Sequence, residues 1–384
     1  MKQLRGFKYR FYPTSSQRLA LAQTLGHSRF VYNWALNLKT NSFYNEGKKV
    51  SYVETSNALT KLKKEEEYKW LKDVSAVPLQ QSLRNLNTAF DRFFKGQGQY
   101  PKFKKKKSKQ SISYTPNAYK WYANTNQLTL AKMESPLKIR WGGRYFTECP
   151  KSITVSKDAS NRYFISFLVE EDLTQWKSNK EEIGIDLGIT DLVITSKGFQ
   201  SGNPKYLRKY EAKLKAAQKK LTKKQKGSRN REKARLVVAK LHAKITGCRK
   251  DFLHKLTTKL VRENQTLVIE TLSVKNMMKN HKLAKSIGDA SWGELIRQLT
   301  YKSDWHGREL IKVDRWFPSS KRCNNCGYVV DKLPLSVREW TCFNCNHTHQ
   351  RDVNAAKNIL ELGTNFITSG DTSDEIETKL VSVS

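Results

Sequence analysis

The sequence lacks the features of a membrane protein and of a secreted, disulfide-linked protein. No apolar run reaches the ~20 residues that span a bilayer, and no amphipathic membrane anchor is recognisable. The opening MKQLRGFKYRFYP is basic and aromatic, without the apolar core of a secretory signal. There are only 6 cysteines, and four of them form two Cys-x-x-Cys pairs, a usage typical of metal-binding thiols in a reducing compartment. We therefore expect no membrane partner and a prokaryotic cytoplasmic location.

Acidic residues are also scarce. The chain has 35 Asp and Glu against 71 Lys and Arg, which gives a formal net charge of +36 over 384 residues. Such an excess repels itself in a compact state and requires a polyanionic partner. Nucleic acid is the expected one, because each phosphate that Lys or Arg neutralises releases counterions. At 38% hydrophobic residues the chain can still bury cores, and its length fits about two or three domains.

The N-terminal half combines two hydrophobic periods. Apolar and basic residues alternate over 1–13, which predicts a strand, and helical spacing follows over 14–109, as in Leu79, Leu83 and Leu86. From residue 110 the period returns to two, with a hairpin signal around 158–161. These patterns predict a small antiparallel sheet or barrel that the N-terminal strand completes, with the helices as an insertion.

Three further segments are defined by charge. The basic run 102–109 lies between folded segments and is expected to be a phosphate-contacting loop. Residues 204–250 contain only Glu211 and Glu232 as acids, and their heptad spacing predicts two antiparallel helices with a basic outer face, joined by a turn at 224–230. The acidic, Ser/Thr-rich residues 366–384 are expected to form a disordered tail.

Three segments place one carboxylate each at a meaningful point. Asp186 interrupts a buried apolar strand, Glu270 ends the strand ThrLeuValIleGlu, and Asp352 lies at the start of a helix. An acid among isoleucines is costly unless its charge meets a cation. The set suits an RNase H-like nuclease, in which such carboxylates hold two Mg²⁺ ions ~3.5–4 Å apart.

Each acid taken alone has an ordinary alternative. Glu270 could be a surface charge at a strand end, and Asp352 could be an acid favoured by the helix dipole. The segment GlyIleAspLeuGlyIleThr around Asp186 also resembles the first phosphate loop of actin and Hsp70-type ATPases, but the second loop of that family is not found. The three acids together carry the nuclease assignment.

The two Cys-x-x-Cys pairs, 15 residues apart, are the most specific local signal. Tetrahedral zinc prefers four soft ligands at this kind of spacing, and redox Cys-x-x-Cys motifs do not occur as facing pairs, so we predict one structural zinc ion in a zinc ribbon. We expect His347 and His349 at the surface or against nucleic acid, and Cys149 and Cys248 unpaired and buried. The zinc ligands are Cys323, Cys326, Cys342 and Cys345.

At this point the chain resembles the TnpB family, proteins encoded by bacterial and archaeal insertion sequences and related to type V CRISPR effectors. The resemblance rests on the position of the Cys pairs between the second and third acids. Matching motifs extend over nearly the whole chain except the acidic tail: TyrArgPheTyrProThr (9–14), ArgPheValTyrAsn (29–33), AspAlaSerTrpGlyGluLeuIleArgGlnLeu (289–299), PheProSerSerLysArgCys (317–323) and ArgAspValAsnAlaAlaLysAsnIle (351–359).

The resemblance implies a multidomain α+β fold. Its parts would be a wedge-like β-barrel domain (1–13 and 110–180), a helical recognition domain (14–109), a RuvC-like α/β nuclease domain (181–322 and 347–365) and an inserted zinc ribbon (323–346). The implied function is cleavage of double-stranded DNA, directed by a guide RNA from the transposon end, beside a short motif that the protein reads. The protein would act as a monomer with its RNA.

The resemblance also implies nucleic-acid contacts. Tyr52, Ser56 and Gln80 match the region that reads the DNA motif, and side chains of these types can contact bases. The basic residues Lys104 and Lys105 are expected to contact nucleic acid as well, and Arg351 to steady the scissile phosphate or to pair with a neighbouring acid.

The sequence departs from the family pattern at two places. Thr271 and Gln350 stand where Asp is common, but all three predicted catalytic acids are present. Two other functions stay open: a transposase, which would join DNA ends without RNA, and a guided repressor or zinc-ribbon nucleic-acid-binding protein, which would not cut.

Overall fold

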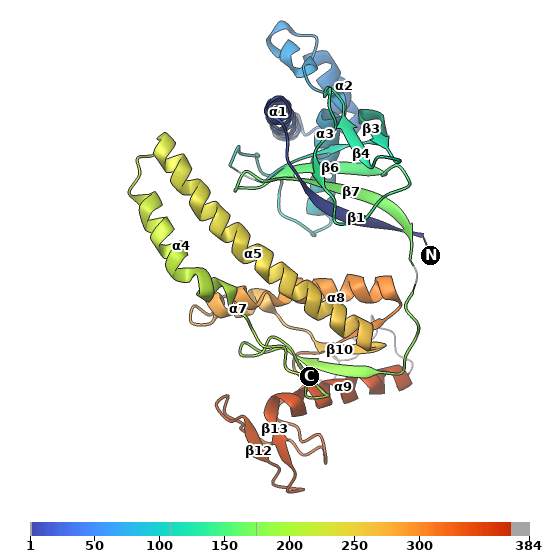
Figure 1. The fold of residues 1–384 in the computed structure, drawn as a ribbon, viewed down its shortest axis with the longest axis vertical. Coiled ribbons are helices and arrows are strands. Elements are labelled where there is room, and N and C mark those ends of the chain that lie inside the picture. The colour runs from blue at the N-terminus through green and yellow to red at the C-terminus, as the bar shows by residue number, and fades with distance from the viewer. Residues whose placement is uncertain (1, 108, 174, 370–384) are drawn as a thin grey trace. The chain divides into compact units, whose positions relative to one another are not determined.

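The computed structural model describes residues 2–107, 109–173 and 175–369, and the chain divides into two compact units, 1–172 and 173–384 (Figure 1). No helix within these described ranges is long and apolar enough to cross a membrane. The finer division into wedge, recognition, nuclease and zinc-ribbon domains stays a prediction.

The first unit is built on an antiparallel sheet. Strand β1 pairs with β7 along its whole length, from Lys2 opposite Asp172 to Phe11 opposite Tyr163, and β6 pairs with β7 across the predicted hairpin. Buried and accessible residues alternate along β7, which confirms the period of two. The strand order is β2 (Gln110–Tyr114), β6 (Ser152–Lys157), β7 (Tyr163–Asp172), β1 (Lys2–Phe11) and β5 (Ile139–Arg140), and a separate hairpin joins β3 (Tyr119–Tyr122) to β4 (Gln127–Leu130).

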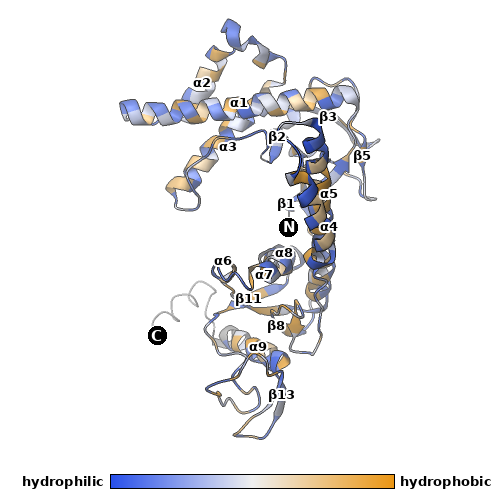
Figure 2. Ribbon diagram, turned by 90° about the vertical axis from the view of Figure 1, so that its left-hand side faces the viewer, coloured by the Kyte–Doolittle hydropathy of each residue, from blue (hydrophilic) through white to orange (hydrophobic). Residues whose placement is uncertain are grey.

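The predicted helical insertion is confirmed between β1 and β2. Thr14 caps the first helix with a complete capping box, and Gly47 ends it in a left-handed conformation. Leu79, Leu83 and Leu86 are buried as their spacing predicts, and Figure 2 shows apolar and polar residues interleaved along α1. The elements are α1 (Ser15–Glu46), α2 (Tyr52–Leu62), the 3₁₀ helix η1 (Glu66–Lys72), α3 (Ala76–Phe94) and, after β2, the 3₁₀ turn η2 (Pro116–Ala118).

The second unit contains a four-stranded sheet of order β11-β10-β8-β9. The first three strands are parallel, and β9 pairs antiparallel with β8. Helix α9 (Arg351–Ser369) packs on the sheet (Figure 1). The strands are β8 (Glu182–Asp186), β9 (Ile194–Thr195), β10 (Thr266–Glu270) and β11 (Glu309–Val313), and the short strands β12 (Glu339–Thr341) and β13 (Thr348–Gln350) form a hairpin.

Two glycines allow α9 to lie against this sheet. A Cβ atom at Gly184 in β8 would be 1.9 Å from the Ala356 carbonyl oxygen, and one at Gly363 in α9 would be 2.4 Å from Val268 Cγ1. At Gly184 only glycine fits, because the two backbones approach this closely, and at Gly363 an added carbon would collide with the Val268 side chain. The start of α9 is thereby held beside the end of β8.

The predicted basic helical pair is confirmed as α4 (Tyr206–Thr222) and α5 (Arg229–Glu263), which pack together. The second helix is longer than the basic segment, because Leu253, Leu256 and Leu260 are buried in the core of the second unit. Three helices follow β10: α6 (Val274–Met277), α7 (Ala284–Ala290) and α8 (Trp292–His306). Residues 366–369 continue α9, so the tail was predicted to begin too early; its remainder, 370–384, lies outside the described residues.

Candidate functional site

The three predicted catalytic acids lie at one edge of the second unit's sheet. Asp186 ends β8 and Glu270 ends β10, and these parallel strands are paired up to Ile185 opposite Ile269. Asp352 lies in the first turn of α9, the helix that packs on β8. Parallel pairing therefore brings the first two acids to the same edge, and helix packing adds the third.

The charges of these acids interact. Burial, and next the Asp352 carboxylate, raise the pKa of Asp186 to about 7, against the opposing effects of the Leu187 backbone N–H and the Arg351 charge. Burial, then Asp186, then Asp314 raise the pKa of Glu270 to about 7. Like charges held together in a half-buried place favour a bound proton or a bound cation. This donor set suits a hard divalent ion, which prefers carboxylate oxygens.

The structure adds two residues that sequence reasoning missed. Asp314 follows Val313, the partner of Glu270 in the β10–β11 pairing, and its charge acts on Glu270. The signal was present, since β11 is an apolar strand followed by an acid. Arg338 Nη1 forms an ion pair with Asp352 Oδ2 at 3.3 Å, and no sequence pattern marked it.

Arg351 is buried, with 7% of its surface exposed. Its Nη1 donates to the Pro334 carbonyl oxygen at 2.7 Å, and its backbone N–H donates to the Arg338 carbonyl at 2.8 Å. The side chain therefore braces the segment that carries Arg338 against the start of α9, while its charge acts on Asp186. Its contact with the scissile phosphate stays a prediction.

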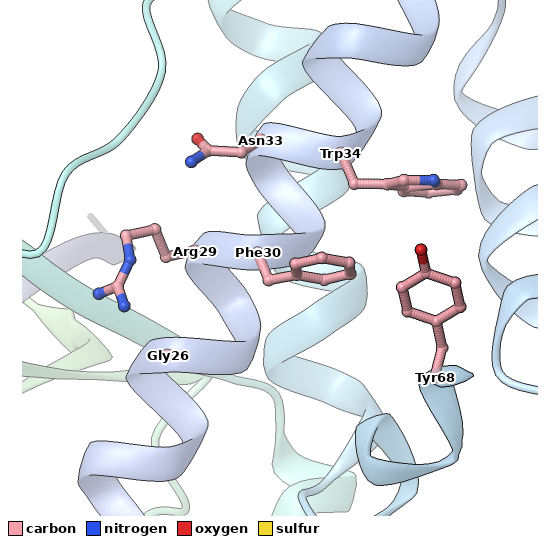
Figure 3. Close-up of a pocket in the computed structure, with 6 residues that line it drawn as sticks. All are labelled: Gly26, Arg29, Phe30, Asn33, Trp34 and Tyr68. Atoms are coloured by element: carbon pink, nitrogen blue, oxygen red, sulfur yellow. The ribbon is translucent and has the colours of Figure 1, made fainter. Parts of the chain in front are cut away.

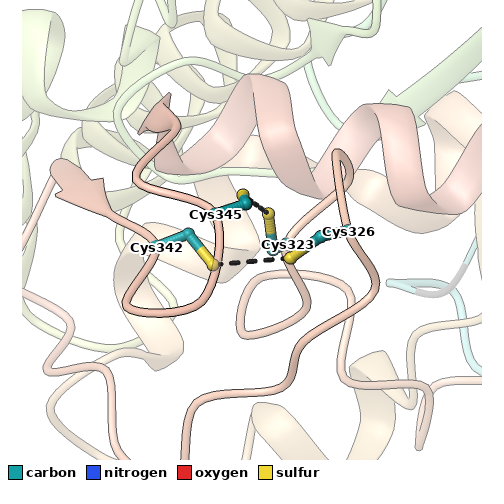
Figure 4. A group of neighbouring side chains, drawn as sticks. All are labelled: Cys323, Cys326, Cys342 and Cys345. Carbon is teal, nitrogen blue, oxygen red and sulfur yellow. Dashed lines mark hydrogen bonds between the residues drawn. The ribbon is translucent and has the colours of Figure 1, made fainter.

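The four predicted zinc ligands come together (Figure 4). Their sulfur atoms all lie within 4.8 Å of one another, and the Cys323–Cys345 and Cys326–Cys342 Sγ pairs are each 3.6 Å apart. A tetrahedral zinc with Zn–S bonds of ~2.3 Å needs similar spacing, so the cluster fits zinc. In the described part of the chain no other group of three or more His, Cys, Asp or Glu brings its ligand atoms this close together. The oxygens of the three carboxylates are therefore farther apart than the four sulfurs.

Two predictions around the cysteines need correction. His349 is buried, and its Nε2 lies 3.0 Å from Cys323 Sγ, because it sits opposite Trp340 in the β12–β13 pairing; His347 is exposed, as expected. Cys149 was predicted buried but is exposed, because it lies in an irregular segment outside the sheet, and Cys248 on α5 is only half-buried. Both are unpaired, as predicted.

The predicted DNA-reading residues lie on neighbouring helices of the first unit. Tyr52 begins α2, and the Arg84 guanidinium of α3 lies 5.3 Å from its ring centroid. Gln80 is exposed one turn before Arg84, and Ser56 is half-buried one turn after Tyr52. The helices thus bring the three residues to one region, while their contact with bases stays a prediction.

Within the predicted phosphate-contacting loop, Lys104 is held in place. Its backbone N–H donates to Asn33 Oδ1 at 2.8 Å, and Asn33 Nδ2 donates to its carbonyl at 3.0 Å. Its Nζ lies 3.8 Å from the Tyr32 ring centroid, and burial lowers its pKa. Lys105 is exposed. Contacts of both lysines with nucleic acid also stay predictions.

Three family descriptions match the chain. Residues 164–281 match a family described as "Probable transposase", and residues 292–359 match a "Cas12f1-like, TNB domain". Residues 1–49 match a "Helix-turn-helix domain", although the structure shows a strand and one uninterrupted helix, Ser15–Glu46, over these residues.

Two named relatives are similar to this chain over nearly their whole length. A Streptomyces pristinaespiralis protein named as an RNA-guided DNA endonuclease is 52% identical, over 96% of this chain and 91% of its own. InsQ of Escherichia coli K12, with the same description in its name, is 31% identical, over 97% of this chain and 95% of its own.

Two solved structures share the fold. That of a Cas12f1–sgRNA–target DNA complex aligns with a TM-score of 0.58 at 14% identity, over 93% of this chain and 98% of that one. The mini-RNA-guided endonuclease CRISPR-Cas_phi3 aligns with a TM-score of 0.56 at 9% identity, over 94% and 92%. Given the full-length identity to InsQ and to the Streptomyces protein, the chain belongs to the TnpB family.

Proposed function

We propose that this protein is an RNA-guided DNA endonuclease encoded by an insertion sequence. A guide RNA from the transposon end directs it to double-stranded DNA beside a short motif, and a single RuvC-like site cuts both strands in turn. The observation that carries the proposal is the meeting of Asp186, Glu270 and Asp352 at one sheet edge, in a chain 52% identical to a protein named for this activity.

The acids would act as ligands of two Mg²⁺ ions. When bound, such ions lower the pKa of a water nucleophile and stabilise the leaving oxygen. The charge of Asp186 interacts with those of both other acids, so the three carboxylates would hold the ions together. Arg338, already paired with Asp352, is placed to neutralise charge on an approaching phosphate.

The remaining parts would serve recognition. We assign the sheet of the first unit to a wedge domain, its helical insertion to a recognition domain with Tyr52, Ser56 and Gln80, and the four-cysteine cluster to a structural zinc ribbon inserted in the nuclease domain. The net charge of +36 supports a nucleic-acid partner throughout, in the cytoplasm and with one protein chain per RNA.

The test is plasmid cleavage by full-length protein co-expressed with its transposon-end RNA. The guide is rewritten to match a site flanked by randomised sequence, and reactions contain Mg²⁺ or EDTA. Asp186→Ala is compared with Glu182→Gln, which changes an exposed acid at the opposite end of the same strand. We expect guide- and Mg²⁺-dependent linear product that only Asp186→Ala abolishes.

Other outcomes would indicate a different function or a different site. Binding without cutting in the wild-type protein would indicate a guided repressor. Strand-transfer products without RNA would indicate a transposase, the activity in the description that residues 164–281 match. Cleavage that survives the loss of Asp186 would refute the site.

A further inference from the structure

A small basic hollow lies beside helix α1 in the first unit. Its volume is about 30 Å³, and its polar lining includes Ser28, Arg29, Lys104, Lys105 and Lys109. None of the described residues that line it is acidic. The hollow is therefore electrostatically suited to a small anion.

Ser28 indicates that this hollow holds a ligand. Its side chain is almost fully buried, at 4% exposure, and its Oγ has no hydrogen-bond partner among the described residues. The nearby Ser82 hydroxyl donates instead to the Ser28 carbonyl, at 3.0 Å. A buried hydroxyl left without a partner destabilises the protein, and a hydrogen bond from it to a phosphate oxygen would remove that penalty.

An aromatic cleft of about 490 Å³ is also lined by residues of α1 (Figure 3). Phe30 and Trp34 project from successive turns of α1 on the side of Tyr68, and all three rings line the cleft. The Phe30 and Tyr68 ring centroids are 5.7 Å apart, and the Phe30 and Trp70 ring centroids are 5.0 Å apart. Half-buried, fixed rings of this kind offer faces on which a base can stack.

The two features share Arg29, which lines both. No hydrogen bond or ion pair of its guanidinium is found in the described part of the chain, and its Nη2 lies over Gly26, 4.0 Å from where a Cβ would be. The Asn33 side chain, which also lines the cleft, donates one hydrogen bond to the Lys104 carbonyl and accepts one from the Lys104 backbone N–H. The basic loop is thereby fixed on the side of α1 that carries Arg29 and Asn33, across the helix from the Phe30 and Trp34 rings (Figure 3).

We infer that this part of the first unit binds an unpaired segment of RNA, with a phosphate oxygen at Ser28 in the hollow and the base of a neighbouring nucleotide against Trp34 in the cleft. The inference rests on the proposed function and adds a site to it. RNA is the fitting partner, because loops present unstacked bases without further cost. Duplex DNA would first have to unpair and unstack a base, which costs free energy that an RNA loop does not lose.

The test measures the affinity of the full-length protein for its transposon-end RNA. Ser28→Ala removes only the unpaired hydroxyl, so folding should be unchanged or improved, while the RNA dissociation constant should rise about five- to tenfold. Trp34→Ala should weaken binding roughly tenfold through lost stacking. Tyr44→Ala is the matched control, because this exposed aromatic on the same helix does not line the cleft. Thermal melting of each variant checks the fold.

Unchanged RNA affinity in both Ser28→Ala and Trp34→Ala would overturn the site while leaving guided cleavage intact. A loss confined to target-DNA binding by the RNA-loaded protein would also overturn it, in favour of a DNA base. A wild-type protein that binds no RNA at all would instead refute the proposed function itself.

Discussion

The four-cysteine cluster and the carboxylate edge are two candidate metal sites built in different ways. The cysteines lie within 22 residues of one another along the chain, and two tight turns and one hairpin gather them. The carboxylates come from β8, β10 and α9, and only the packing of the sheet brings them together. A local site can be recognised by spacing, whereas a distributed site needs the fold.

The two sites are also connected. Asn324 follows Cys323. Its backbone N–H donates to Asn354 Oδ1 at 3.0 Å, and Asn354 Nδ2 donates to the Arg322 carbonyl at 2.8 Å. Arg322 in turn pairs with Glu361 at 2.6 Å. These contacts tie the cysteine cluster to α9, the helix that carries Asp352.

The largest effect is expected from the carboxylate edge. Asp186→Asn, Glu270→Gln or Asp352→Asn should each reduce guided cleavage at least about a thousandfold, since lost metal stabilisation of the transition state amounts to several kcal/mol. Guide-dependent DNA binding should persist. Glu309→Gln, at the far end of β11, is the control and should cut as the wild type does. Cleavage retained in the Glu270 variant would remove that residue from the site.

Loss of one cysteine should disrupt the four-cysteine cluster and, through α9, also the carboxylate edge. Cys342→Ser should abolish stoichiometric zinc, expose the cluster to protease and lower cleavage by more than about tenfold, because the contacts that hold α9 are lost. Zinc content, limited proteolysis and cleavage are measured together. Cys149→Ser, at the exposed unpaired cysteine, should change none of them. Full cleavage in zinc-free protein would show that the sites are independent.

The close approach of α9 to β8 can be tested by adding one carbon. Gly184→Ala places a Cβ against the Ala356 carbonyl, so the free energy of unfolding should fall by roughly 1–3 kcal/mol and cleavage should fall with it. Gly247→Ala is the matched control in α5, where the added carbon meets nothing within 4 Å. It should raise stability by ~0.4–1 kcal/mol. Denaturant unfolding compares the two, and equal effects would contradict the packing argument.

The smallest effect concerns pH. The pKa values of Asp186 and Glu270 are raised to about 7, so their protonated forms stabilise the metal-free protein, and this stability is lost as pH rises from the ordinary carboxyl pKa of about 4 to about 7. Melting temperature without metal should therefore fall between about pH 4 and pH 7. Between about pH 6 and pH 8, cleavage at limiting Mg²⁺ should rise about tenfold per acid that must ionise. Asp186→Asn should flatten the melting profile, and a pH-independent wild-type profile would show that the acids do not interact.

Several misplaced predictions share one physical cause. His349 was expected at the surface, yet pairing between β12 and β13 places it beside Trp340 and Cys323. Asp314 was overlooked, yet the β10–β11 register places it next to Glu270. In both cases strand pairing, which depends on distant segments, decided the surroundings of the side chain.

The sequence alone determined the features that depend on composition and local spacing. These are the need for a polyanionic partner, the strand and helix periods, and the cysteine cluster whose four sulfurs the structure gathers. It also singled out the three acids, because Asp186 interrupts and Glu270 ends an apolar strand and Asp352 starts a helix; their catalytic role stays a prediction. Only the tertiary structure decided that Asp314 and Arg338 join them, that His349 is buried, and that Ser28 faces a basic hollow, because these neighbours come from segments far apart in the chain that meet only when sheets pair and helices pack.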